Sequence, residues 1–70
     1  MNDDEQVQPD EIHEAIGLAA TYLMNAQMPV KPSNLLMVLR AQSIMTTESR
    51  QKRILEAARQ QIMERVTHTA

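Results

Sequence analysis

Few side chains in this 70-residue sequence are of a type that carries out chemistry. There is no cysteine, which excludes a disulfide and a thiolate metal site. His13 and His68 stand near opposite ends, and neither has a second histidine at metal-site spacing. The single glycine excludes a glycine-rich phosphate loop. We therefore expect a protein that is not an enzyme, holds no metal or cofactor, and takes no small-molecule substrate.

The charged residues are divided unevenly along the chain. Residues 1–30 contain six acidic residues and no Lys or Arg, whereas residues 31–70 contain seven basic and three acidic residues. This split has three interpretations: a basic third helix against nucleic-acid phosphates, an acidic first helix docked on a basic partner, or an ordinary solvated face. Acidic residues interrupt the basic ones, which weakens the first interpretation. The candidate contacts to nucleic acid or to an acidic partner are Arg50, Lys52, Arg53 and Arg59.

The elements that must position these residues begin with a helix over residues 9–27. Residues 1–8 are polar and acidic, and we expect a flexible arm there. Pro9 suits the first helical position, since the missing N–H has no partner there anyway. Apolar residues then recur at spacings of three and four, which predicts one buried face. Gly17 and its small neighbours would allow another helix to approach closely, or Gly17 is simply a tolerated mid-helix glycine.

Two further helices are expected, over residues 32–45 and 47–66. The prolines at 29 and 32 end the first helix and begin the second, with Lys31 or Ser33 as its cap. Thr47 is a candidate N-cap for the third helix, and residues 67–70 should fray. No stretch alternates with a period of two, so strands are not expected. The predicted fold is all-α, a small hairpin-like domain of three helices.

The second helix predicts self-association. Its residues are apolar nearly all round, and a chain of 8.0 kDa has little material to cover it on every side. We therefore expect a homodimeric helical bundle. The residues predicted to form its core or dimer interface are Ile16, Ala19, Ala20, Leu23, Leu35, Leu36, Val38, Leu39, Ile54, Leu55, Ala58 and Ile62.

Parts of the first two helices resemble a known family. The stretch from Glu14 to Met24 and the run Ser33–Leu39, followed by Thr46 and Thr47, are similar to the AriR/YmgB-like family. Its members are described as biofilm and acid-resistance regulators or two-component-system connector proteins. The resemblance covers roughly residues 10–50, and it implies a helical dimer that contacts a response regulator, with DNA binding as a further proposal. The prolines at 29 and 32 and the shorter arm depart from the family pattern.

These observations predict a regulatory adaptor that binds a signalling or transcription regulator in biofilm, stress or acid-resistance control. The alternatives are a DNA-binding regulator that uses the third helix, and a small helical chaperone or assembly partner. We expect a cytoplasmic protein, since acidic residues follow Met1 where a signal peptide needs basic ones. The longest apolar run, Leu35–Leu39, is too short to cross a membrane.

Overall fold

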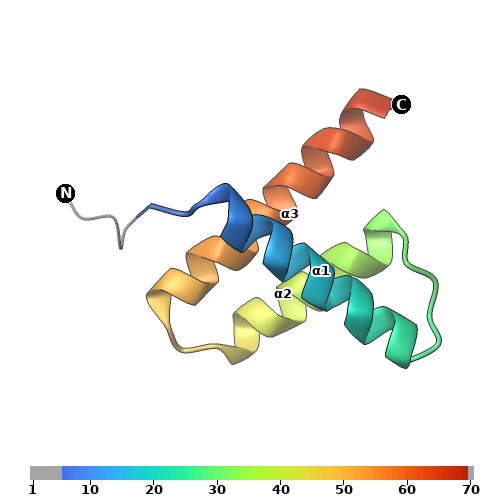
Figure 1. Ribbon diagram of the computed structural model, residues 1–70, viewed down its shortest axis with the longest axis horizontal. Helices are drawn as coiled ribbons and strands as arrows, with labels where there is room; N and C mark the ends of the chain where they lie inside the picture. Colours follow the sequence, from blue (N-terminus) through green and yellow to red (C-terminus); the bar gives the residue numbers. More distant parts are fainter. Residues whose placement is uncertain (1–5, 70) are drawn as a thin grey trace.

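A computed structural model of the chain describes residues 6–69, and the side chains up to Thr67. The described part contains three helices and no strand: α1 (Pro9–Asn25), α2 (Pro32–Met45) and α3 (Ser49–Thr69). Helices α2 and α3 form a hairpin, and α1 lies across it (Figure 1). The last turns of α3 project beyond the other two helices (Figure 1). The predicted all-α class is confirmed.

The start of α1 agrees with the prediction, but its end does not. Pro9 occupies the first turn, and the Glu11 carboxylate accepts a hydrogen bond of 2.9 Å from the backbone N–H of Gln8. The helix ends at Asn25, two residues earlier than expected. Gln27 takes a left-handed conformation with φ of 59°, which turns the chain out of the helix.

Two backbone hydrogen bonds close this end of α1. The N–H of Met28 donates to the carbonyl of Leu23 at 2.9 Å, and the N–H of Gln27 donates to the carbonyl of Met24 at 3.1 Å. Together they form a Schellman motif, in which glycine is the usual left-handed residue. Here that position is glutamine, so although Pro29 indicates that the helix ends before it, nothing in the sequence marks Asn25 as the last residue.

The bounds of α2 match the prediction, while those of α3 are shifted. Lys31 is the N-cap of α2, and Pro32 begins the helix. The prediction of Thr47 as the N-cap of α3 is wrong, because Glu48 supplies the carbonyl that accepts from Lys52 N–H at 3.0 Å. The helix begins at Ser49 and continues through Thr69, three residues past the expected end at Val66. Ala70 lies outside the described residues.

All three helices contribute to one apolar core. The largest side chains that are completely covered are Leu23 in α1, Leu39 in α2 and Leu55 in α3. No polar or charged residue in the described part is buried. The full set of buried residues is Ala15, Ala19, Leu23, Val38, Leu39, Ile54, Leu55, Ala58 and Ile62.

The segment before α1 is attached to this core instead of forming part of a flexible arm. Val7 is partly buried and packs against the core residues. The backbone carbonyl of Gln6 accepts a hydrogen bond of 3.2 Å from Arg50 in α3. The expectation of a flexible arm over residues 1–8 is therefore wrong for residues 6–8, and residues 1–5 lie outside the described part.

Gly17 does not mark a close helix contact within the chain. It is exposed on α1, and a Cβ atom built there would meet nothing within 4 Å. Ala19, in contrast, is completely covered by the other helices. Among the described helices, none is long and apolar enough to cross a membrane.

Candidate binding surfaces

Large apolar side chains are exposed along one side of α1 and α2. Leu18 and Tyr22 stand one turn apart on α1, and Met37, Ile44 and Met45 lie on α2. Their exposed fractions range from 51% for Met37 to 80% for Met45. Single exposed apolar residues are ordinary, but a group on one side of two adjacent helices indicates a binding surface. With Ala41, which lies between them, these residues form what we call the α1/α2 face: Leu18, Tyr22, Met37, Ala41, Ile44 and Met45.

The α1/α2 face contains a hollow of about 410 Å³ between the two helices. Tyr22 lines it from α1, and Met37, Ala41 and Met45 are among the residues that line it from α2. No lining residue is charged. A partner could therefore cover the hollow without removing a charge from water, which would be costly.

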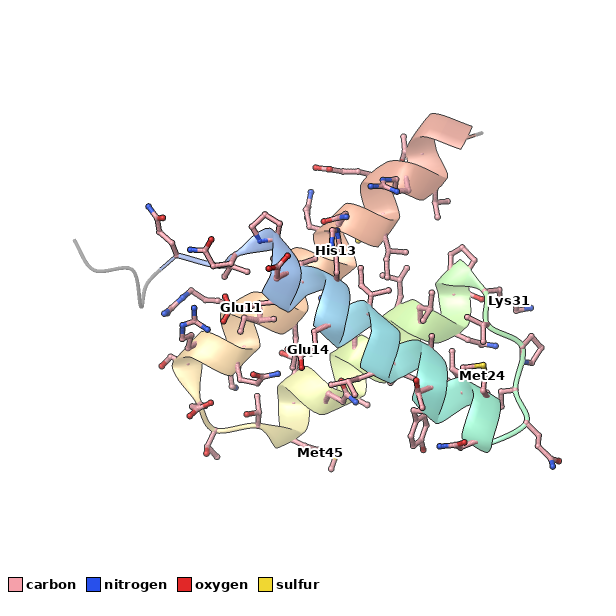
Figure 2. The ribbon with its side chains drawn as sticks, in the orientation of Figure 1. Glu11, His13, Glu14, Met24, Lys31 and Met45 are labelled. Carbon is pink, nitrogen blue, oxygen red and sulfur yellow. The ribbon has the colours of Figure 1, made fainter. Side chains whose placement is uncertain are left out.

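Charged residues border the α1/α2 face on each helix. Glu14 lies one turn before Leu18, and Arg40 lies one turn before Ile44. Both are exposed, and neither belongs to the ion pairs found among the described residues. Figure 2 shows Glu14 on the same side of α1 as Met45, with His13 on the other side.

A second hollow, the α2/α3 groove, lies at the opposite end of α2. It has a volume of about 340 Å³ and is lined by the first turn of α2 and the projecting turns of α3. Leu36, Met63 and Val66 provide its apolar surface. All of its lining residues except Thr67 lie within the predicted helices, but the prediction did not say that the start of α2 and the end of α3 meet. Its full lining is Pro32, Ser33, Leu36, Met63, Val66 and Thr67.

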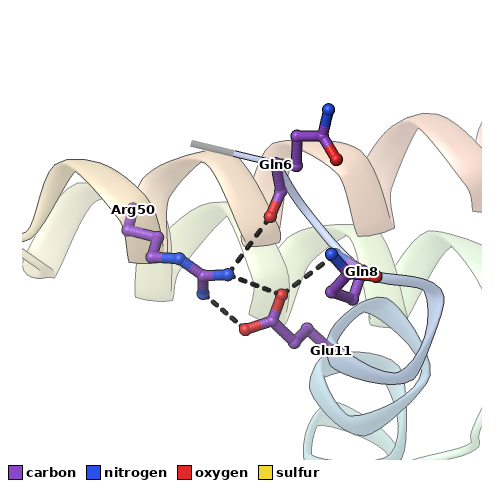
Figure 3. Close-up of polar contacts among 4 residues, drawn as sticks. All are labelled: Gln6, Gln8, Glu11 and Arg50. Atoms are coloured by element: carbon purple, nitrogen blue, oxygen red, sulfur yellow. Dashed lines mark hydrogen bonds and ion pairs between the residues drawn. The ribbon is translucent and has the colours of Figure 1, made fainter. Parts of the chain in front are cut away.

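An ion pair connects the starts of α1 and α3. Both terminal nitrogens of Arg50 bond the two carboxylate oxygens of Glu11, one of them at 2.9 Å (Figure 3). The same carboxylate accepts from Gln8, and Arg50 also reaches the Gln6 carbonyl (Figure 3). Hydrogen bonds from the Arg50 guanidinium and from the Gln8 N–H favour the charged carboxylate, which holds the pKa of Glu11 below its ordinary value of 4.5. We call this group of contacts the Glu11–Arg50 clasp.

The residues predicted for the core or dimer interface lie in the core of a single chain. Eight of them are buried, and Ile16, Leu35 and Leu36 are partly buried against that core, as Ala20 is to a similar degree. The exposed large apolar residues of α2 are instead Met37, Ile44 and Met45, which were absent from the predicted set. The eight buried residues are Ala19, Leu23, Val38, Leu39, Ile54, Leu55, Ala58 and Ile62.

The four basic residues proposed for nucleic acid do not form one exposed basic patch. Arg50 is engaged in the clasp, and Arg59 donates a hydrogen bond of 2.7 Å to Glu56. The Nε atom of Arg59 is buried, so its guanidinium lies against the protein surface. Lys52 and Arg53 are exposed near the start of α3.

The described residues contain no cluster of potential metal ligands. No group of three or more His, Cys, Asp or Glu side chains among them could hold a metal ion. His13 is exposed on α1, while the side chain of His68 lies outside the described part.

Comparison of the chain with known protein families, with curated proteins and with solved structures finds no match. The resemblance to the AriR/YmgB-like family stays a prediction.

Proposed function

We propose that this protein is a small non-enzymatic regulatory adaptor, which acts by binding a signalling or transcription regulator protein. The observation that carries this proposal is the presence of two separate apolar surfaces at opposite ends of α2. The α1/α2 face involves the second half of α2, from Met37 to Met45, and the α2/α3 groove involves its first turn. An adaptor must hold two molecules at once, and two surfaces on different sides of one rigid helix meet that need.

The core supports a role in binding, because it is complete without these surfaces. Leu23, Leu39 and Leu55 fill the interior of one chain. The apolar side chains outside it make little contribution to folding, and exposed apolar patches on soluble domains typically mark interaction sites. Methionine is prominent among them, with Met37 and Met45 on one surface and Met63 on the other. Its flexible, polarizable side chain suits adaptable protein contacts.

The biological process in which the protein acts is proposed from the family resemblance alone. The AriR/YmgB-like pattern in α1 and α2 favours a cytoplasmic protein that acts in biofilm, stress or acid-resistance control through a response regulator. We assign that regulator to the α2/α3 groove, where Met63 and Val66 belong to the projecting part of α3 and are accessible from outside the bundle.

Affinity purification from the cells that make the protein tests this proposal. We expect the full chain to recover a transcription regulator, identified by mass spectrometry, and Met63→Glu to lose it, because a carboxylate in the groove would have to be desolvated. Met24→Glu is the matched control, since Met24 is exposed on α1 and lines neither hollow. The control should retain the regulator.

Other results would replace the proposal. Recovery of the chain alone would contradict an adaptor function. Recovery of a secreted or aggregation-prone subunit would favour the chaperone alternative. Tight binding of the purified chain to duplex DNA at moderate salt, lost when Lys52 and Arg53 are replaced by Gln, would favour the DNA-binding alternative.

A further inference from the structure

We infer that the α1/α2 face is covered by a second copy of this chain, in a two-fold symmetric dimer that brings Glu14 of each copy to Arg40 of the other. This inference rests on the proposed function, which treats the α1/α2 face as a binding surface, and it names the molecule that binds there. It also places the dimer interface on residues different from those expected from the sequence, which form the core of a single chain.

Two stripes of residues, one on each helix, make the α1/α2 face suitable for helix packing. On α1, Glu14, Leu18 and Tyr22 follow one another at intervals of four. On α2, Met37 and Ala41 are followed by Ile44 and Met45, at intervals of three and four. Residues at these intervals lie on one side of a helix. Each stripe can therefore pack along a helix of another molecule, with the hollow between them accepting its side chains.

The charges beside the two stripes are complementary to each other. Every Asp and Glu between residues 9 and 45 is on α1, and Arg40 is the one charged residue of α2. Glu14 precedes the apolar part of its stripe by one turn, and Arg40 lies beside the middle of the other. The α1 stripe of one copy can lie on the α2 stripe of another with Glu14 at the middle of that stripe, and in this register Glu14 meets Arg40 at the border of the contact. Opposite charges at the border fix the register of an interface.

A two-fold axis makes this contact occur twice. In such a dimer the same patch is used by both copies, so that α1 meets α2 and α2 meets α1 across the axis. The uncharged lining of the hollow would be enclosed, while both Glu14–Arg40 pairs would stay at the solvent border. An ordinary interface buries about 800 Å² per partner. That is about a sixth of the 5142 Å² that this chain exposes, an extent in keeping with one side of two helices.

Sedimentation equilibrium of the full chain tests the dimer. We expect the mass of two chains for the wild type at about 100 μM, a concentration at which weak dimers form. Ile44→Glu should give the mass of one chain with an unchanged helical circular dichroism spectrum, because Ile44 is 70% exposed and outside the core. Met63→Glu is the matched control and should remain dimeric. A monomeric wild type, or a dimeric Ile44→Glu, would overturn the inference.

Charge reversal tests the register. In dimers of Glu14→Arg alone, or of Arg40→Glu alone, both border pairs become repulsive, and we expect dimerisation to weaken roughly fivefold. Mixing the two variants should yield heterodimers in preference to either homodimer, because each Glu or Arg then faces an opposite charge. The double variant should return to wild-type dimerisation. Equal amounts of all dimers in the mixture, measured by native mass spectrometry, would overturn the Glu14–Arg40 pairing.

The outcomes separate this inference from the proposed function. If Ile44→Glu is monomeric but still recovers the regulator, the dimer assignment and the adaptor function are both supported. If the wild type is a monomer that recovers a regulator, the dimer fails and the adaptor function survives. If the chain is a dimer that recovers only itself, the adaptor function fails and the dimer survives.

Discussion

The Glu11 carboxylate makes contacts both within α1 and with α3. It closes the first turn of α1 through Gln8 and binds Arg50 at the start of α3. The sequence predicted only that an acidic residue in the first turn would be favourable. The contact with Arg50 could not be predicted, because it depends on how two helices cross.

The stability of the domain should depend on pH through Glu11. Its pKa is lowered in the folded chain, so the ionised carboxylate stabilises the fold above about pH 4.5, its ordinary pKa. That contribution is lost as the pH falls through the lower pKa of the folded state. Glu11→Gln should therefore unfold at lower urea than the wild type at pH 7, and the difference should shrink below pH 4.5.

Asp10→Asn provides the control for this measurement. It removes another first-turn charge, yet Asp10 is exposed and does not belong to the clasp. Its effect at pH 7 should be smaller than that of Glu11→Gln. A wild type and a Glu11→Gln variant that differ equally at pH 7 and pH 3 would show that the clasp does not contribute through charge.

At Gly17, the addition of a single methyl group should raise the stability of the fold. Nothing lies within 4 Å of the added Cβ, and glycine within a helix costs about 1 kcal/mol relative to alanine. We expect Gly17→Ala to raise the free energy of unfolding in urea by roughly that amount. Gln60→Ala, at an exposed position of α3, should change it far less. A loss of stability would mean that another chain packs on Gly17, which would place the dimer contact away from the α1/α2 face.

At the scale of elements, the ends of helices are where sequence and structure disagree. Pro9 and Pro32 fix the starts of α1 and α2, because proline favours the first turn for a local reason. At the end of α1, Pro29 set only a limit, since glutamine holds the left-handed position that glycine usually takes. The start of α3 was placed on Thr47 because its side chain can cap, but Glu48 precedes the helix.

The Schellman motif at the end of α1 makes a specific prediction. The left-handed conformation of Gln27 costs any residue other than glycine about 1 kcal/mol. Glycine avoids this cost, but it also raises the conformational entropy of the unfolded chain, which cancels part of the gain. We expect Gln27→Gly to raise the urea midpoint, with a gain of roughly 0.5 kcal/mol. Gln27→Ala keeps the strain and should give no gain. If alanine stabilises as much as glycine, the motif does not form in solution.

The apolar pattern of α2 shows how much of the burial of a helix can be predicted from periodicity. It predicted correctly that Val38 and Leu39 would be covered, but it could not tell them from Met37 or Ile44, because the helix is apolar on nearly every side. Which side is covered depends on the lengths and crossing of α1 and α3. The binding surfaces depend on that tertiary arrangement. The sequence therefore indicated that α2 takes part in binding, but not which of its residues are exposed for it.

At the scale of the whole molecule, the dimer should appear in the dependence of stability on concentration. A partner that binds only the folded chain stabilises it by mass action. We expect the melting temperature of the wild type to rise between about 5 and 200 μM, because the dimer is populated only at the higher concentration. The melting temperature of Ile44→Glu should stay constant over that range. A constant value for both would contradict self-association through the α1/α2 face.

The clasp also has a consequence for biosynthesis. Glu11 and Arg50 lie 39 residues apart, and the ribosome makes Glu11 first. When Arg50 has just been added to the growing chain, it is inside the exit tunnel of the ribosome, and Glu11 is 39 residues nearer to the exit. The first turn of α1 therefore leaves the ribosome before Arg50 does, and the clasp forms only after the start of α3 has also left it.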